Sequence, residues 1–158
     1  MDASADPIGL LLEQHDHLED LFARHQDALV DRRWEDAARL LDEYSQHLKR
    51  HIELEERYLL PQCAHLRIPR WPGDVYHAEH RRIELLLYKA RASLAHACRD
   101  GITSRVLIVL LDHEGTFKRL IEHHHEREEQ GLFRELRCGP CVEARSAIIR
   151  NAIGCEIP

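Results

Sequence analysis

Apolar residues recur at steps of three and four along most of the chain, which is the period of an amphipathic helix. The pattern predicts four long helices, over about 7–31, 34–60, 73–99 and 104–136, and a short fifth helix over about 142–152. Strand-like alternation of useful length does not occur in the sequence. The chain is therefore predicted to be all-α.

Helix breakers separate these segments. Asp6 and Pro7 suit a helix start, and the segment 67–73 contains two prolines and predicts a loop. Gly101 is placed to end the third helix, and 139–140 (Gly-Pro) to end the fourth. Short connections favour an antiparallel up-down-up-down four-helix bundle at 1–137, followed by a C-terminal extension at 138–158.

Each predicted helix has one stripe of residues that should face the core. In chain order the stripes are Ile8, Leu11, Leu12, His15, Leu18, Phe22, His25 and Leu29; Leu41, Tyr44, Leu48, His51, Ile52, Glu55 and Leu59; Tyr76, His80, Ile83, Leu87, Ala90, Leu94 and Ala97; and Val106, Leu110, His113, Phe117, Leu120, His124, Glu128 and Leu132. The stripes include histidines and two glutamates. Buried glutamate is costly unless it is paired or bound to a cation.

Composition narrows the function classes. The chain has 13 histidines among 158 residues and a formal net charge of −6. This balance predicts no nucleic-acid partner and no anionic membrane partner. The longest aliphatic run, 106–111, is too short to cross a membrane, and the N-terminus lacks the basic flank of a signal peptide. Five cysteines without a disulfide framework predict a reduced, cytoplasmic protein.

Two His-x-x-x-Glu pairs point to metal chemistry. Residues four apart share one helix face, so His51 with Glu55 and His124 with Glu128 should each point inward together. A rise of about 1.5 Å per residue places His15 and His80 within about two turns of the same level. The predicted dinuclear metal ligands are His15, His51, Glu55, His80, His124 and Glu128. Imidazole with carboxylate suits iron, manganese or zinc, and a metal-free polar network is the alternative.

The other histidines receive different predictions. His25 and His113 lie towards the far end of the bundle and are predicted to be hydrogen-bonded core residues. His47 is a candidate for contact with one of the metal-ligating side chains, and His77 is a candidate fifth imidazole ligand of the metal. The histidines predicted to lie at the surface are His17, His65, His96, His123 and His125.

The two halves of the chain carry the same motifs in the same order. His15 and His80 each begin His-x-x-aliphatic-x-x-aliphatic, and His51 and His124 each begin His-x-x-x-Glu-Glu-x-x-Leu. Over about 8–136 this repeat resembles the hemerythrin-like (HHE cation-binding) family. The resemblance implies a non-haem di-iron centre whose ligands are the same six residues, bridged by the two carboxylates and an oxo or hydroxo group.

The resemblance implies a protein that binds or senses dioxygen or a related diatomic such as nitric oxide. One alternative is a di-iron redox enzyme, either peroxidase-like or active in iron–sulfur cluster repair, and another is iron storage or delivery. Manganese or zinc remain alternatives to iron. A ferritin-like oxidase needs Glu-x-x-His on two helices, whereas this chain has one such pair, Glu122 with His125.

Cys138 and Cys141 form a Cys-x-x-Cys after the fourth predicted helix. Three interpretations remain open: a turn that ends the helix, a thiol pair that can oxidise, or part of a metal site with Cys155 or Cys63. A thioredoxin motif would need a preceding strand. If the pair oxidises, it would add a redox response to the bundle.

Overall fold

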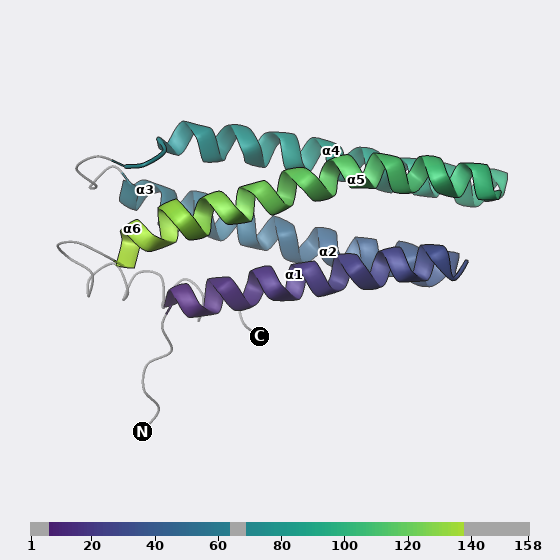
Figure 1. Ribbon diagram of the computed structural model, residues 1–158, viewed down its shortest axis with the longest axis horizontal. Coiled ribbons are helices and arrows are strands. Elements are labelled where there is room, and N and C mark those ends of the chain that lie inside the picture. Colours follow the sequence, from purple (N-terminus) through teal and green to yellow (C-terminus); the bar gives the residue numbers. More distant parts are fainter. Residues whose placement is uncertain (1–6, 64–68, 138–158) are drawn as a thin grey trace, which may run out of the picture.

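The computed structural model describes residues 7–63 and 69–137, and all secondary structure in these ranges is helical (Figure 1). The elements are α1 (Pro7–Val30), α2 (Trp34–Leu54), the π-helix η1 (Glu55–Leu59), α3 (Leu60–Cys63), α4 (Gly73–Asp100), α5 (Ser104–Arg127), the π-helix η2 (Glu128–Phe133) and α6 (Arg134–Arg137). The all-α prediction is confirmed. The predicted fifth helix, the 139–140 helix end and the Cys138–Cys141 pair lie outside the described residues.

Four long helices lie side by side, with α1 next to α2 and α4 next to α5 (Figure 1). Residues 31–33 connect the first pair and residues 101–103 connect the second. Gly101 ends α4 at φ 93°, a left-handed conformation that glycine adopts without steric cost. Thr103 then caps α5, because its hydroxyl accepts a hydrogen bond from the Val106 N–H at 3.3 Å.

The predicted core stripes are buried in α1, α2 and α4, with only Leu12 partly exposed. In α5 the buried positions differ from the prediction. The buried residues of this helix are Leu110, Glu114, Phe117, Ile121, His124 and His125, whereas Val106 and Leu120, predicted to face the core, are only partly buried. His113, predicted to be a core residue, is exposed. The difference follows from the helical period. A step of four from Leu110 reaches Glu114, and its carboxylate can be buried because it bonds to a buried histidine.

The core consists of two apolar clusters. We call the one near α3 and α6 the near cluster; it contains Ile8, Leu11, Leu54, Leu59, Leu60, Tyr76, Leu132, Phe133 and Leu136. The larger far cluster contains residues such as Leu18, Phe22, Tyr44, Ile83 and Phe117. On α1 the near cluster ends at Leu11 and the far cluster begins at Leu18, so His15 lies between them. His80 lies in the same way between Tyr76 and Ile83, which leaves a polar layer between two apolar blocks.

None of the described helices is long and apolar enough to cross a membrane.

Candidate metal centre

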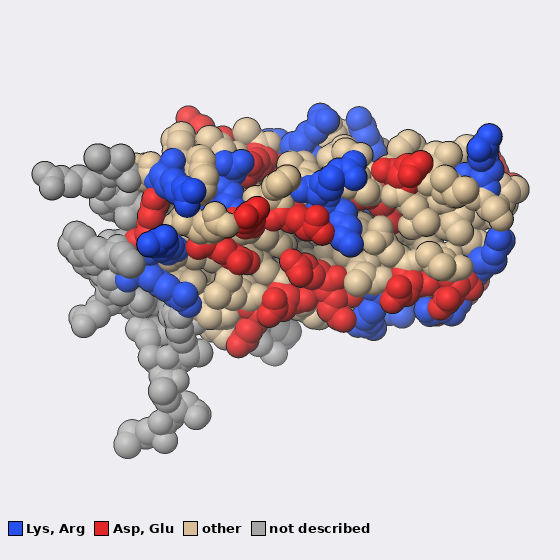
Figure 2. Space-filling model, viewed as in Figure 1, with Lys and Arg blue, Asp and Glu red and all other residues tan. Residues whose placement is uncertain are grey.

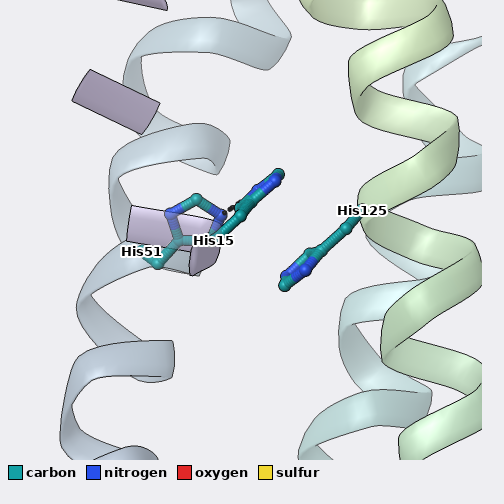
Figure 3. A group of neighbouring side chains, drawn as sticks. All are labelled: His15, His51 and His125. Atoms are coloured by element: carbon teal, nitrogen blue, oxygen red, sulfur yellow. Dashed lines mark hydrogen bonds between the residues drawn. The ribbon is translucent and has the colours of Figure 1, made fainter. Parts of the chain in front are cut away.

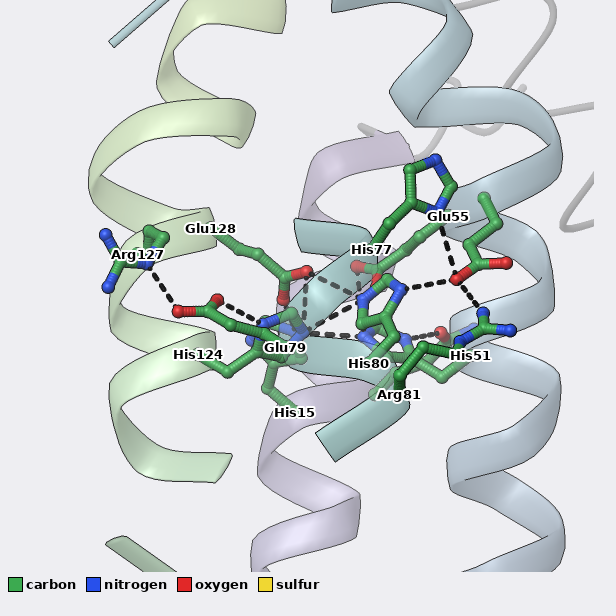
Figure 4. Close-up of polar contacts among 12 residues, drawn as sticks. His15, His51, Glu55, His77, Glu79, His80, Arg81, His124, Arg127 and Glu128 are labelled. Carbon is green, nitrogen blue, oxygen red and sulfur yellow. Dashed lines mark hydrogen bonds and ion pairs between the residues drawn. The ribbon is translucent and has the colours of Figure 1, made fainter. Parts of the chain in front are cut away.

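The six predicted ligand residues converge in the polar layer (Figure 4). His15 comes from α1, His51 from α2, His80 from α4 and His124 from α5. All six side chains are buried, and Glu55 and Glu128 have no exposed surface. The structure therefore brings together every residue that the motif spacing selected.

A π-helical turn begins at each glutamate of the cluster. Glu55 is the first residue of η1 and Glu128 is the first residue of η2. The Glu55 N–H bonds to the carbonyls of His51 and Ile52, and the Glu128 N–H bonds in the same way to His124 and the residue after it. Wide π turns within α-helices are rare and occur mainly at functional sites. The sequence predicted continuous helices here, without these turns.

The donor atoms form two groups of four that share both carboxylates. One group is His15, His51, Glu55 and Glu128, and the other is Glu55, His80, His124 and Glu128. Within each group one ligand atom from every residue lies within 4.8 Å of the others. Each group offers two imidazole nitrogens and two carboxylate oxygens, a donor set that suits a divalent transition metal.

Each carboxylate directs one oxygen to each group. Glu55 Oε1 lies 3.1 Å from His51 Nε2, and its Oε2 lies 3.3 Å from His80 Nε2. Glu128 Oε2 lies 3.3 Å from His15 Nε2, and its Oε1 lies 2.9 Å from His124 Nε2. Both glutamates are therefore oriented as bridges between the two groups.

The outward nitrogen of every imidazole has an acceptor of its own. His15 Nδ1 donates to Glu129 at 3.0 Å, and His80 Nδ1 donates to Glu56 at 3.0 Å. In the same way, the remaining Nδ1 donors reach Gln14 at 2.8 Å from His51 and Glu79 at 3.0 Å from His124. A carboxylate or an amide oxygen accepts only, so each Nδ1 carries a proton. The Nε2 atoms of neutral imidazoles are then lone-pair donors that face the centre.

This arrangement fits cations and is unfavourable without positive charge. His15 Nε2 lies 3.1 Å from His51 Nε2, and His80 Nε2 lies 3.1 Å from His124 Nε2. All four oxygens of the two bridging carboxylates are buried without a hydrogen-bond donor. Lone pairs that face one another in a buried layer repel unless a cation or protons lie between them. The donor chemistry therefore matches two metal ions.

The carboxylates also shift the titration of the facing imidazoles. Although burial opposes the change, Glu128 raises the pKa of His124 to about 10. Burial likewise opposes the shift at His80, where Glu128 and Glu55 raise the pKa to about 9. In return, and despite its complete burial, His124 holds the pKa of Glu128 well below its usual range. The layer thus attracts positive charge, which protons supply when no metal is bound.

The four outer acceptors follow the internal repeat, although they are not among the residues predicted from the sequence. Gln14 and Glu79 precede the first histidine of each half and bond the second histidine of the same half. Glu56 and Glu129 follow the bridging glutamates and bond the first histidine of the opposite half. The repeated Glu-Glu and the polar residue before His15 were visible signals, since hydrogen-bonded outer partners are usual around metal-bound histidines.

Arginines hold two of the outer carboxylates. Arg81 bonds to Glu56, and Arg127 Nε donates to Glu79 at 2.9 Å. Partial burial opposes ionisation of Glu56, yet hydrogen bonds from Arg81, His80 and His77 lower its pKa to about 2. These acceptors are therefore held as carboxylates, which fixes the orientation of His80 and His124.

The remaining histidines lie outside the two groups of four. His77 contacts Glu56 at 3.2 Å and belongs to neither group of four, so the structure does not bring it to the centre as a fifth imidazole. His47 faces His17, with ring centroids 4.8 Å apart, and bonds Arg50. His25 is a hydrogen-bonded core residue, as predicted. The predicted surface positions of His17, His96 and His123 are confirmed, and His65 lies outside the described residues.

His125 was predicted at the surface, and this prediction is wrong. Its side chain is 4% exposed, and it stacks on His15 with ring centroids 3.8 Å apart (Figure 3). Burial, together with the nearby His15, lowers the pKa of His125 to about 2, so the ring is neutral. Neither ring nitrogen has a hydrogen-bond partner. The α1–α5 contact buries this residue, and the period of α5 alone does not reveal it.

The fold and the cluster define a helical bundle with a buried histidine–glutamate site for cations. Among models of protein families, the hemerythrin HHE cation-binding domain matches residues 6–114. The chain belongs to this family. The match includes four of the six candidate ligands and ends before His124 and Glu128, whose place in the cluster rests on the geometry. No curated protein and no solved structure matches the chain.

Proposed function

We propose that the bundle holds two iron ions at His15, His51, Glu55, His80, His124 and Glu128, and that it binds or senses dioxygen or a related diatomic such as nitric oxide. The observation that carries this proposal is the pair of four-residue groups sharing both carboxylates. The up-down-up-down order of the helices, expected from the short connections, is part of the proposal. So are a cytoplasmic location and the division into a bundle at 1–137 and an extension at 138–158.

The donor count leaves room for a small ligand. Each group supplies four donor atoms, whereas iron in such sites is commonly six-coordinate. Two bound iron ions would supply open coordination positions and electrons to a diatomic molecule. The protein holds the imidazoles through their Nδ1 bonds, and the near and far apolar clusters exclude bulk water from the layer.

The tyrosine of the far cluster is not placed to donate a proton to the centre. Tyr44 on α2 is the fully buried phenol in the far cluster, where its ring packs against Phe22 at 5.3 Å and Phe117 at 5.8 Å. Burial, together with Glu19, raises the pKa of Tyr44. A phenol in this packing is a poor proton donor to the centre. Ligand binding is our proposal, and a peroxidase-like or cluster-repair reaction is the alternative.

Metal content and optical spectra test the proposal. Purified full-length protein should contain about two irons per chain, with near-ultraviolet absorption that bleaches on anaerobic reduction and returns with dioxygen. Rapid turnover of hydrogen peroxide would instead favour the enzyme, and rapid loss of iron to a chelator would favour storage or delivery. Protein that takes up no iron and shows no such bands after reconstitution contradicts the di-iron centre.

A further inference from the structure

A cavity of about 400 Å³ lies between α1 and α5, beside the centre. Its exposed lining carries the four carboxylates Asp16, Glu19, Asp20 and Glu122, against the single cation Lys118. Figure 2 shows acidic side chains gathered over the seam between these two helices. Among the described residues only Asp20 of these four has an ion pair, with Arg24 at 3.4 Å. We call these four exposed carboxylates the rim of the cavity. Together with Lys118 they leave the rim with a net negative charge.

The cavity also has a buried lining, and it includes the unpartnered His125. Beside this histidine the lining is mainly apolar, with Leu18, Phe22 and Ile121. His125 stacks on His15, and one nitrogen each of His15, His51 and His125 lie within 4.8 Å of one another (Figure 3). A buried imidazole whose ring nitrogens have no hydrogen-bond partner offers a nitrogen donor to a metal ion. This donor lies between the charged rim and the first group of four.

The internal repeat supplies a counterpart for comparison. The equivalent seam between α2 and α4 has a cavity of about 150 Å³ lined by Ile52, Glu84, Lys49 and Arg91. When His51 is matched to His124, Ile52 takes the position of His125 and Lys49 takes the position of Glu122. The counterpart is therefore smaller, is not acidic overall and has no imidazole. The acidic rim and the buried donor occur together on one side of the bundle.

We propose that the α1–α5 cavity is the entry site for divalent metal ions. The carboxylate rim attracts the hydrated ion, and His125 is its first nitrogen ligand before transfer to His15 and His51. The step exchanges ligands and involves no change in oxidation state: water and His125 leave the ion as the ligands of the first group replace them, and protons held by those ligands are released to water. This inference rests on the proposed metal centre.

Rates of metal loading test the rim. Metal-free full-length protein is mixed with Co²⁺, whose visible absorption reports its ligands, and uptake is followed by stopped flow. The triple variant Asp16→Asn, Glu19→Gln and Glu122→Gln should load about tenfold more slowly at low salt, and the difference should vanish near about 0.5 M salt. The charge-matched control is Asp27→Asn, Glu53→Gln and Asp112→Asn, which alters exposed carboxylates outside the cavity and should load as wild type.

A second pair of variants tests the buried donor. His125→Leu should slow loading about tenfold at both salt concentrations, because a nitrogen ligand is lost without a change in rim charge. Ile52→Leu places the same side chain in the counterpart cavity and should leave the rate unchanged. Final metal content should stay at two ions in every variant, since a route changes the rates of entry and exit together.

The rate of metal loading tests the entry site, and the final metal content tests the metal centre. A wild-type chain that binds two ions, with all variants loading at its rate, overturns the entry site and leaves the centre intact. Equal slowing by the rim variant and its charge-matched control also overturns the entry site. A wild-type chain that takes up no metal at equilibrium overturns the centre, and the entry site with it.

Discussion

The bundle contains two buried histidine–glutamate clusters, and they differ in how their polar atoms are satisfied. In the far half, His25 Nδ1 donates to the Ala37 carbonyl at 2.8 Å, and His25 Nε2 lies 2.9 Å from Glu114 Oε1. Glu114 Oε2 also accepts from Gln26 at 3.3 Å. In the candidate metal centre, all four oxygens of Glu55 and Glu128 lack a donor.

The difference shows that burial alone does not identify a metal site. Glu114 is 1% exposed, almost as deeply buried as the two bridging glutamates. The hydrogen bond between His25 and Glu114 completes that pair, which then stabilises the fold without a metal. The centre has more acceptors than donors, so its requirement for positive charge is met by cations. Counting unpaired acceptors separates the two clusters where burial does not.

Loss of one bridging carboxylate should have the largest effect. Glu128→Gln removes a charged ligand from both groups at once, so metal affinity should fall about 100-fold or more at both positions. Metal analysis after dialysis against a weak chelator measures the effect. The matched change in the other cluster, Glu114→Gln, should keep the full metal content because its amide can still donate to His25. Normal metal binding by Glu128→Gln would contradict the shared bridge.

Removal of the far carboxylate should instead reduce stability. Glu114→Leu leaves His25 Nε2 buried without a partner, and unfolding free energy should fall by about 2 kcal/mol. Urea unfolding with and without bound metal measures the loss. The loss should be the same in both conditions because the two clusters share no residue. A loss of metal content in Glu114→Leu would show that the clusters are coupled.

Packing near the two clusters should respond differently to an added methyl group. A Cβ at Gly131, inside η2, would lie 2.6 Å from the Trp71 ring and 3.1 Å from the Tyr76 hydroxyl. Gly131→Ala should therefore reduce stability by about 1.5 kcal/mol. Gly115→Ala, beside Glu114, meets only the Arg119 side chain at 3.6 Å and should stabilise α5 by about 0.5 kcal/mol. Thermal unfolding of the two variants should therefore shift in opposite directions.

The outer acceptors should have a smaller effect on metal binding than the bridges. Glu79→Gln keeps an oxygen that accepts from His124 but removes its charge, so metal affinity should fall about tenfold. Gln14 already accepts the corresponding hydrogen bond from His51 in the first half of the chain. The substitution therefore gives His124 the same kind of acceptor that His51 has. Competition with a chelator measures the affinity, and exposed Glu126→Gln is the control. A 1000-fold loss would mean that Glu79 is itself a ligand.

Raising the pH should reduce the stability of the metal-free protein and increase its affinity for metal. In the metal-free chain, the raised pKa of His80, about 9, and of His124, about 10, stabilises the fold below about pH 6.5. This stability should be lost as the pH rises through those values. Metal affinity should increase over the same range, because ligation requires deprotonated imidazoles.

Urea midpoints at pH 6.5 and pH 9, with chelator and with metal, measure both trends. From pH 6.5 to pH 9, the urea midpoint of the metal-free protein should decrease. Over the same range, the increase in midpoint on adding metal should become larger. The low pKa of His125, about 2, lies outside this range and does not alter the sign. A stabilisation by metal that is the same at both pH values would contradict competition between protons and metal at the same nitrogens.

The sequence by itself determined the helices and the inward-facing pairs. His51 with Glu55 and His124 with Glu128 are four residues apart, and local helix geometry places such residues on one face wherever the helix lies. The repeat of these pairs in the two halves, and the levels of His15 and His80, were enough to select all six candidate ligands. Those residues could be predicted because helix geometry fixes both the face of a residue and its height along the helix.

Only the tertiary structure decided which neighbouring residues are buried and which acceptor each histidine meets. His113 is exposed and His125 is buried, contrary to both predictions, because contacts between helices fix the rotation of α5. The crossed bonds from Glu56 to His80 and from Glu129 to His15 join opposite halves of the repeat. A helical period gives a face to within about one residue, and the packing of neighbouring helices selects among the residues at its edge.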